Sequence, residues 1–295
     1  LPYTSSWGDV YELNLSLDAD MYVSHGVNPD SDSIDPGSAA NTFSGVTGRI
    51  FPQGSFKWRY PFVHPGENIT QKFQPIAQLV LSPKCCNSGK IANEDSRTFE
   101  FDDTKLFSAD RFSGLDRVDA GSRVNYGLQW DAYGRKGGKA EVRIGQSYQF
   151  LRPDDLPVNS GIDEDFSDLV GRLSLAPNDL FGMTYRFRFD LSDTKMKRQE
   201  VDLHVGPTEL SLSAIYTQLA SNANLSQRKQ IYGGLSTQFA DYWKARVGAS
   251  YDIANSQVNG LSAAFGYNDE CFGVNLSAQY TPDGDTDESS GKFAA

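Results

Sequence analysis

The sequence of 295 residues has no uninterrupted apolar stretch of the roughly 18 residues that a membrane-spanning helix requires. This absence excludes a helical membrane protein but not a β-barrel, because a barrel strand shows lipid only every second side chain. Basic charge is also scarce, since 27 Lys and Arg stand against 38 Asp and Glu, for a formal net charge of -11. A chain with no surplus of cations cannot neutralise a run of phosphates, so we expect no binding to nucleic acid.

Cysteine and histidine are rare, with three of each in the chain. The cysteines are Cys85, Cys86 and Cys271, and the histidines are His25, His64 and His204. Neither set has the spacing of a metal site, so the sequence predicts no metal and no cofactor. A barrel hydrolase would need His25 or His204 beside a serine or carboxylate partner, and neither has local support. We therefore expect that the chain is not an enzyme.

Helical periodicity is nearly absent, and what recurs is strict alternation of apolar and polar residues between turns rich in Gly, Asp, Asn and Pro. In Tyr11–Val23 every odd-numbered residue is apolar and nearly every even-numbered one is polar. Such alternation indicates antiparallel strands, and it predicts about thirteen of them. The others are Thr42–Phe62, Gln71–Ser82, Ala120–Ala132, Ala140–Phe150, Phe166–Ala176, Phe181–Leu191, Arg198–Gly206, Glu209–Gln218, Arg228–Phe239, Tyr242–Asp252, Gln257–Asn268 and Cys271–Thr281.

The segment Thr42–Phe62 contains Pro52 and could form either two strands or one. Its apolar residues keep one parity across the proline, from Val46 to Phe62. A slip of one residue would move every side chain to the other face. We therefore predict one long strand, kinked at Pro52.

The lengths of the connections support this interpretation. With one strand over Thr42–Phe62, the long connections Ser24–Asn41, Pro83–Asp119 and Leu151–Asp165 share one end of the sheet, as the outer loops of a transmembrane barrel do. The strand count is odd, whereas bacterial single-chain barrels have an even number. We therefore expect a partial barrel domain over residues 1–281, followed by a polar tail over residues 282–295.

A soluble β-sandwich also alternates, but three features favour a transmembrane barrel. Nearly every run is ten residues or longer, about twice the usual length of a soluble strand. Charges such as Arg143 and Lys244 fall in mid-strand, which suits a wet lumen, and aromatics such as Trp58 and Trp243 gather near strand ends. The predicted fold is an all-β, antiparallel transmembrane β-barrel, multi-pass, in an outer membrane.

The long connection carries the most specific sequence. It reads Asn93-Glu94-Asp95-Ser96, then Phe99-Glu100-Phe101-Asp102-Asp103-Thr104-Lys105-Leu106-Phe107, then Arg111-Phe112-Ser113-Gly114-Leu115-Asp116-Arg117-Val118. It follows Trp58-Arg59-Tyr60-Pro61-Phe62 and Gln74-Pro75-Ile76-Ala77-Gln78-Leu79, and a late turn reads Tyr267-Asn268-Asp269-Glu270-Cys271-Phe272-Gly273. From about Asp18 to about Tyr280 the chain resembles the barrel domain of LptD, the outer-membrane lipopolysaccharide-assembly family, in its alphaproteobacterial form.

The resemblance implies a function. Members of this family have a periplasmic jellyroll and a barrel of about 26 strands, which is plugged by the lipoprotein LptE. They receive lipopolysaccharide from a periplasmic bridge. The lipid passes through a lateral opening between the first and last strands, and the sugars pass through the lumen. The chain would supply roughly the second half of such a barrel, in contact with outer-membrane lipid and without the jellyroll. The alternative is a general or substrate-specific porin.

The resemblance also implies that Cys271 forms a disulfide with a cysteine of the N-terminal periplasmic domain, outside this chain. The alternative is an unpaired thiol. Cys85 and Cys86 lie on an outer loop, and a vicinal disulfide and two idle thiols are equally compatible with the sequence.

Two groups of charged residues are candidate contacts for lipopolysaccharide. The first is the lumen-loop motif, whose members are Asn93, Glu94, Asp95, Asp102, Asp103, Arg111, Asp116 and Arg117. Its carboxylates could position divalent cations, or they could hold the loop in the lumen through pairs with Arg97, Lys105, Arg111 and Arg117. The second group consists of Arg123, Arg143, Arg186, Arg188, Lys244 and Arg246. These cations could contact sugar or phosphate, or pair with acids on neighbouring strands.

Overall fold

The computed structural model describes residues 2–27, 42–96, 99–153, 156–221, 227–282 and 292–294. They form a 16-stranded antiparallel sheet in which strands pair in chain order, except that β3 pairs with β5, and β4 adds to β5 beyond the end of β3. The strands are β1 (Tyr3–Thr4), β2 (Val10–Val27), β3 (Phe43–Arg59), β4 (Phe62–Pro65), β5 (Ile69–Leu81), β6 (Ser122–Gly134), β7 (Lys139–Leu151), β8 (Leu169–Asn178), β9 (Phe181–Asp190), β10 (Lys195–Val205), β11 (Leu210–Leu219), β12 (Arg228–Phe239), β13 (Trp243–Asp252), β14 (Gln257–Asn268), β15 (Gly273–Thr281) and β16 (Lys292–Ala294).

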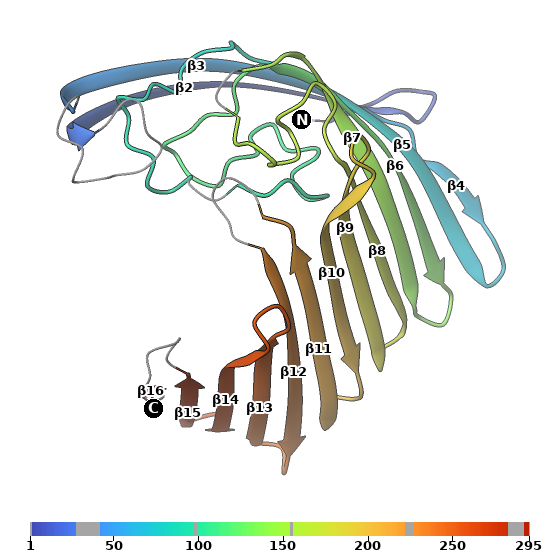
Figure 1. The fold of residues 1–295 in the computed structure, drawn as a ribbon. Coiled ribbons are helices and arrows are strands. Elements are labelled where there is room, and N and C mark those ends of the chain that lie inside the picture. Colours follow the sequence, from blue (N-terminus) through green and yellow to red (C-terminus); the bar gives the residue numbers. More distant parts are fainter. Residues whose placement is uncertain are drawn as a thin grey trace.

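The sheet curls into an arc, and the connections that follow β5 and β7 fold into its hollow side (Figure 1). Within the described ranges, β1 and β16 form the two edges of the sheet and do not pair with each other. No described residue belongs to a helix that is long and apolar enough to cross a membrane. The arrangement confirms the predicted antiparallel all-β fold, as an open portion of a barrel wall.

The prediction of one strand through Pro52 is confirmed. Pro52 lies inside β3, where it pairs with Leu17 of β2, and the register runs without a shift from Val10 to Ser24. A proline is tolerated here because β3 pairs with β5 only from Gly54 onward. The interruption comes later than predicted, between β3 and β4.

The two ends of the sheet differ in their connections. The turns after β6, β8, β10, β12 and β14 are short, whereas the connections after β5 and β7 at the opposite end are long. The predicted connection at residues 28–41 and the acidic tail Asp283–Glu288 lie outside the described residues. Several strands begin later than predicted, by two or three residues at Ser122, Leu169 and Gly273, and Phe166 makes only an isolated bridge to Tyr148.

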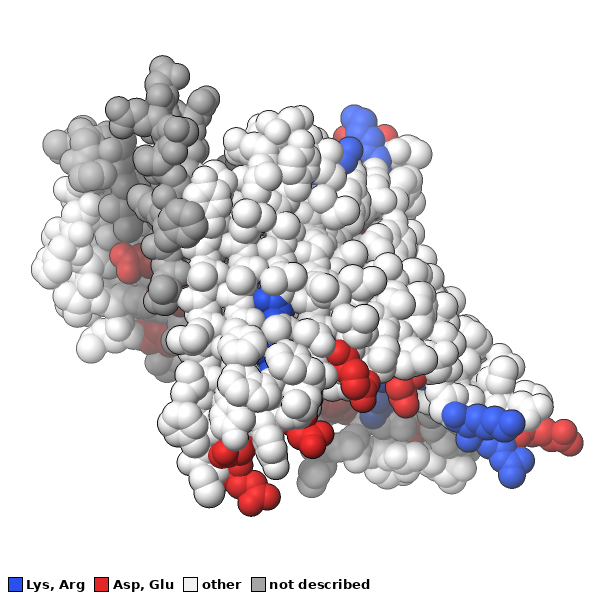
Figure 2. Space-filling model, turned by 90° about the horizontal axis from the view of Figure 1, so that it is seen from below, with Lys and Arg blue, Asp and Glu red and all other residues white. Residues whose placement is uncertain are grey.

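The apolar side chains of the alternating strands lie on the outer face of the sheet. The fully outward side chains Leu15, Met21 and Leu276 are 79%, 77% and 66% exposed. Aromatic rings gather on this face near the short turns, where Trp243 contacts Phe265 and Tyr267. Seen from below, most of the visible surface is uncharged, and charged side chains gather mainly at its edges (Figure 2). An apolar face with aromatic rings near the strand ends suits contact with hydrocarbon.

Candidate functional site in the hollow of the sheet

Two segments cover the inner face of the sheet. We call residues 82–121, which join β5 to β6, the lumen loop, and residues 152–168, which join β7 to β8, the second loop. An apolar cluster of buried side chains joins both loops to the wall. The lumen loop supplies most of its members, the second loop supplies Ile162 and β8 supplies Val170. The lumen-loop members are Phe99, Phe101, Leu106 and Phe112. Burial of these side chains fixes the lumen loop against the wall.

A buried ion triad ties the end of the lumen loop to β6. Asp119 accepts hydrogen bonds from Arg111 through Nε at 2.7 Å and Nη2 at 2.8 Å. Arg123 of β6 approaches the same carboxylate to 2.9 Å and donates to the backbone carbonyls of Ser108 and Ala109. Burial alone would raise the pKa of Asp119, but the two guanidiniums outweigh it and hold the pKa below its usual range. The triad is therefore a charged anchor.

A second anchor lies at the outer end of β2 and β3. Arg49 of β3 pairs with Asp20 at 2.6 Å and donates to the backbone carbonyls of Leu115 and Asp116. The Asp116 carboxylate in turn accepts the backbone N–H of Asp95. Asp95 and Asp116 thus act as acceptors for backbone N–H groups within the loop, which is a common role of Asp in turns.

Arginines line the wall beneath the lumen loop. Arg143 of β7 lies opposite Arg172 of β8, and Arg172 lies opposite Arg186 of β9. Two residues further along β9, on the same face of the sheet, Arg188 lies opposite Arg198 of β10. We call these five residues the arginine row. Like charges on adjacent strands repel, so the row requires counterions.

The counterions come from the wall and from both loops. The wall supplies Glu141, which pairs with Arg143 at 3.4 Å, and Glu200, which pairs with Arg186 at 2.6 Å. Three pairs come from the lumen loop, and they are Asp103 with Arg186 at 3.9 Å, Glu100 with Arg188 at 3.5 Å and Asp102 with Arg198 at 3.6 Å. The second loop adds Asp168, 3.5 Å from Arg188.

Burial shapes the titration of these loop acids. It raises the pKa of Asp103, which is 2% exposed, and the pKa of Glu100, because removal from water disfavours the charged carboxylate. Burial also raises the pKa of Asp168 to about 6, although Arg188 opposes the shift. In all three cases the loss of water outweighs the nearby guanidiniums.

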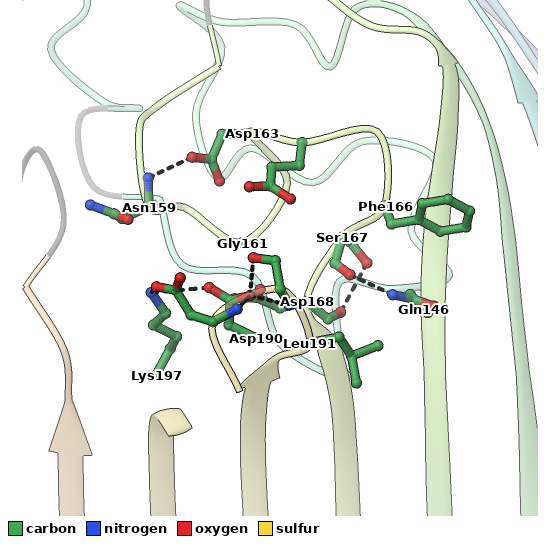
Figure 3. Close-up of a pocket in the computed structure, with 13 residues that line it drawn as sticks. Gln146, Asn159, Gly161, Asp163, Phe166, Ser167, Asp168, Asp190, Leu191 and Lys197 are labelled. Atoms are coloured by element: carbon green, nitrogen blue, oxygen red, sulfur yellow. Dashed lines mark hydrogen bonds and ion pairs between the residues drawn. The ribbon is translucent and has the colours of Figure 1, made fainter. Parts of the chain in front are cut away.

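A cavity of about 470 Å³ opens beside the second loop, at its contact with the turn between β9 and β10 (Figure 3). Its charged lining is acidic apart from Lys197, which pairs with Asp190 at 3.1 Å and with Asp193 at 3.4 Å. The other acids in its lining are Asp163, Glu164 and Asp168. Within the described residues, no group of three or more Asp, Glu, His or Cys side chains is arranged to hold a metal ion.

The structure brings most of the predicted residues together and separates some of them. Arg186 and Arg188 pair with acids of the lumen loop, Arg143 pairs with Glu141 of its own strand, and Arg123 belongs to the buried triad. Lys244 and Arg246 lie on β13, separated from β9 by three strands, and their side chains are exposed. Arg97 lies outside the described residues.

Pairing within the lumen loop differs from the expectation. Arg111 pairs with Asp119, a residue of the same loop that was not on the list of candidates. Asp102 and Asp103 reach arginines of the wall instead of cations of their own loop. The reason is that the loop folds flat against β8–β10, so its acids face the sheet. Asn93 accepts the backbone N–H of Ser96 within the loop.

Cys85 and Cys86 form a disulfide with each other, which resolves the alternative left open by the sequence. Cys271 is exposed and unpaired in the described part of the chain. It lies in the turn between β14 and β15, where its backbone N–H donates to Asp269.

Sequence reasoning missed Arg172, Arg198, Asp119 and Asp168. The two arginines could have been found, because Arg172 has the polar parity of its strand and Arg198 begins a predicted strand. Asp119 and Asp168 could not, since their roles depend on how two irregular loops fold.

The chain is similar to proteins of one family. The family model LptD, described as LPS transport system D, matches residues 1–233. The LPS-assembly protein LptD of Chromobacterium violaceum is 23% identical over 225 residues, which cover 72% of this chain and 28% of that protein. LPS-assembly protein LptD of Yersinia pestis is 26% identical over 302 residues, which cover 94% of this chain and 37% of that protein. The chain thus spans about a third of the length of these relatives.

Among solved structures, the porin OmpF of Salmonella typhi, in a complex with daunomycin, aligns over 95% of this chain and 92% of its own. The sequence identity is 11% and the TM-score is 0.32, below the level at which two folds can be equated.

Proposed function

Because the chain belongs to the LptD family of LPS transport proteins, we propose that it forms part of the outer-membrane barrel that transports lipopolysaccharide and assembles it in the outer leaflet. The observation that carries this proposal is the family match, which covers β1–β11, the lumen loop and the second loop. In this proposal residues 1–281 belong to the barrel domain.

The two faces of the wall support this function. Lipopolysaccharide has acyl chains, sugars and phosphates, so its transport requires both an apolar surface and a polar one. The sheet offers apolar side chains such as Leu15 and Leu276 outside and the arginine row inside. The lumen loop fills part of the hollow side, which is unlike an open diffusion pore.

We propose three kinds of partner for the whole protein. Lipopolysaccharide is its cargo, an LptE-like lipoprotein plugs its lumen, and a periplasmic transport bridge delivers the cargo through a domain outside this chain. The exposed turn that carries Cys271 is available to a thiol of such a domain. No chemical step on the cargo is part of the proposal.

The test is depletion of the parent protein in cells. We expect newly made lipopolysaccharide to stop reaching the cell surface, measured by surface labelling of its sugars, while uptake of small solutes is unchanged. Complementation by the full-length gene is the control. Normal surface lipopolysaccharide together with slower solute uptake would contradict the proposal and favour a porin.

A further inference from the structure

We propose that the arginine row is a site for the phosphate groups of lipopolysaccharide, and that the carboxylates of the lumen loop occupy it while the loop is docked. Cargo phosphate and loop would then exchange on the same guanidiniums. This inference rests on the proposed function, because it names the chemical group of that cargo which the wall recognises.

Charge balance is the first argument. With the lumen loop docked, the five arginines face four loop acids and the wall acids Glu141 and Glu200. Without Glu100, Asp102 and Asp103, the same five arginines would face three of the described acids, which are Glu141, Glu200 and Asp168. Undocking would therefore expose a cationic surface on β7–β10, and arginine is well suited to bind phosphate in a bidentate manner.

The second argument is that the loop acids fit the row loosely. The Asp103 carboxylate is buried among arginines, yet neither of its oxygens makes a hydrogen bond to the described chain, and its ion pair with Arg186 measures 3.9 Å. The Nε groups of Arg143 and Arg172 are also buried without a hydrogen-bond acceptor in that part of the chain. A phosphate has more acceptor oxygens than a carboxylate and can satisfy such donors better.

The third argument is the contrast with the anchors of the loop. Asp119 is held by hydrogen bonds of 2.7 and 2.8 Å, and Arg49 holds Asp20 at 2.6 Å. Among the described contacts, the ion pairs of the loop with the row are 3.5 Å or longer. Charge thus fastens segment 99–107 less tightly than the ends of its loop, and these ion pairs are the part of the docking that a phosphate can replace. Burial of Phe99, Phe101 and Leu106 opposes undocking, so we expect the undocked state to be the minor one.

The experiment measures undocking in the full-length protein with its plug partner. Trypsin cleavage at Lys105, followed by mass spectrometry, reports on segment 99–107, because the docked Lys105 is half-buried with its ammonium 4.6 Å from the centre of the Phe99 ring. We expect Asp102→Asn with Asp103→Asn to raise the cleavage rate roughly 5- to 10-fold, since cleavage follows the open population. Asn at 102 keeps the acceptor for the Thr104 backbone N–H.

The matched control removes two negative charges elsewhere. Glu67→Gln with Glu209→Gln changes two exposed acids with no ion pair to the arginine row among the described contacts. We expect its cleavage rate to equal that of the unmodified protein. Equal rates in the two double variants would overturn the inference.

A second measurement needs no variant that might misfold. Purified lipopolysaccharide should raise cleavage of the unmodified protein at Lys105 in a saturable way, and enzymatically dephosphorylated lipopolysaccharide should not. The same measurement with inorganic pyrophosphate distinguishes lipid-borne phosphate from free phosphate. If lipopolysaccharide alone raises the cleavage rate at Lys105, the site binds the lipid-borne group. If pyrophosphate raises the rate as well, the site binds phosphate in general. No effect of either, or equal effects with and without lipid phosphate, would overturn the inference. Surface lipopolysaccharide in depleted cells tests the proposed function separately.

Discussion

Asp119 and Arg123 form an ion pair of 2.9 Å in which both side chains are almost completely buried. The aspartate belongs to the lumen loop and the arginine to β6, so the pair joins loop and wall. Arg111 completes the triad, which leaves one carboxylate to balance two guanidiniums. Buried charges are retained at such a cost only when each has a partner.

The first prediction concerns this triad. Asp119→Asn should destabilise the docked lumen loop by about 3–5 kcal/mol, because it leaves two buried cations without a counterion. Hydrogen exchange of the loop amides measures the effect. The control is Asp193→Asn, which affects the half-exposed partner of Lys197 and should cost less than about 1 kcal/mol. Equal exchange rates in the two variants would contradict the role of the anchor.

The second prediction concerns pH. The folded protein raises the pKa of Asp168 to about 6, above its usual value, so the folded state binds this proton more tightly than the unfolded state. The second loop should therefore gain stability as pH falls from about 6.5 to 4, and lose it as pH rises through 6. Asp168→Asn, which imitates the neutral acid, should remove this contribution to the pH dependence and stabilise the protein at pH 7 by up to about 3 kcal/mol. Burial also raises the pKa of Glu100, Asp103 and Asp110, so part of the pH dependence remains in the variant. Thermal melting in detergent across this range measures both effects, and a variant whose melting temperature depends on pH as steeply as that of the unmodified protein would refute the assignment.

The fold could be predicted from the sequence because its physical cause is local. A strand between lipid and water must alternate, and the parity that Val46 shares with Phe62 shows that the chain does not change faces at Pro52. Strand ends were less predictable, since Phe166 continues the alternation but is already part of the second loop.

The site could be predicted only in part. The inward parity of Arg143, Arg186 and Arg188 is readable from their strands, and the acids of the lumen loop stand out in sequence. Which acid meets which arginine depends on the path of the loop over β8–β10. That path is set by buried rings such as Phe101, which carry no periodic signal.

The third prediction tests the two faces of the wall. Leu17→Arg puts a charge at an outward position that is 67% exposed, where it should cost roughly 2–4 kcal/mol in the membrane. Ser16→Arg, the next residue, faces the hollow side and should be tolerated. The amount of heat-modifiable folded barrel in outer membranes measures the difference. Equal amounts of both variants would refute the assignment of the faces.

The fourth prediction concerns orientation. A cysteine at Leu115, which is 78% exposed on the lumen loop, should react with an impermeant maleimide on intact cells. A cysteine at Asp179, in the short turn between β8 and β9, should react only after the outer membrane is permeabilised. Both cysteine variants also carry Cys271→Ser, so that Cys271 itself is not labelled. The protein with Cys271→Ser alone gives the background labelling. Labelling of Asp179 alone on intact cells would reverse the proposed topology.

The last prediction concerns Cys271. Its turn is at the same end of the sheet as Asp179, the end that the proposed orientation places in the periplasm, where disulfides form and persist. Cys85 and Cys86 are already bonded to each other, so Cys271 is the one described cysteine that is left for an external partner. In the full-length protein, Cys271→Ser should abolish a mobility shift between reducing and non-reducing gels, because a bond between distant segments makes the denatured chain more compact. Cys85→Ser with Cys86→Ser should leave the shift in place, since a bond between adjacent residues closes no large loop. If the shift survives Cys271→Ser and disappears with the pair, the external partner belongs to the lumen loop and the proposed disulfide is wrong.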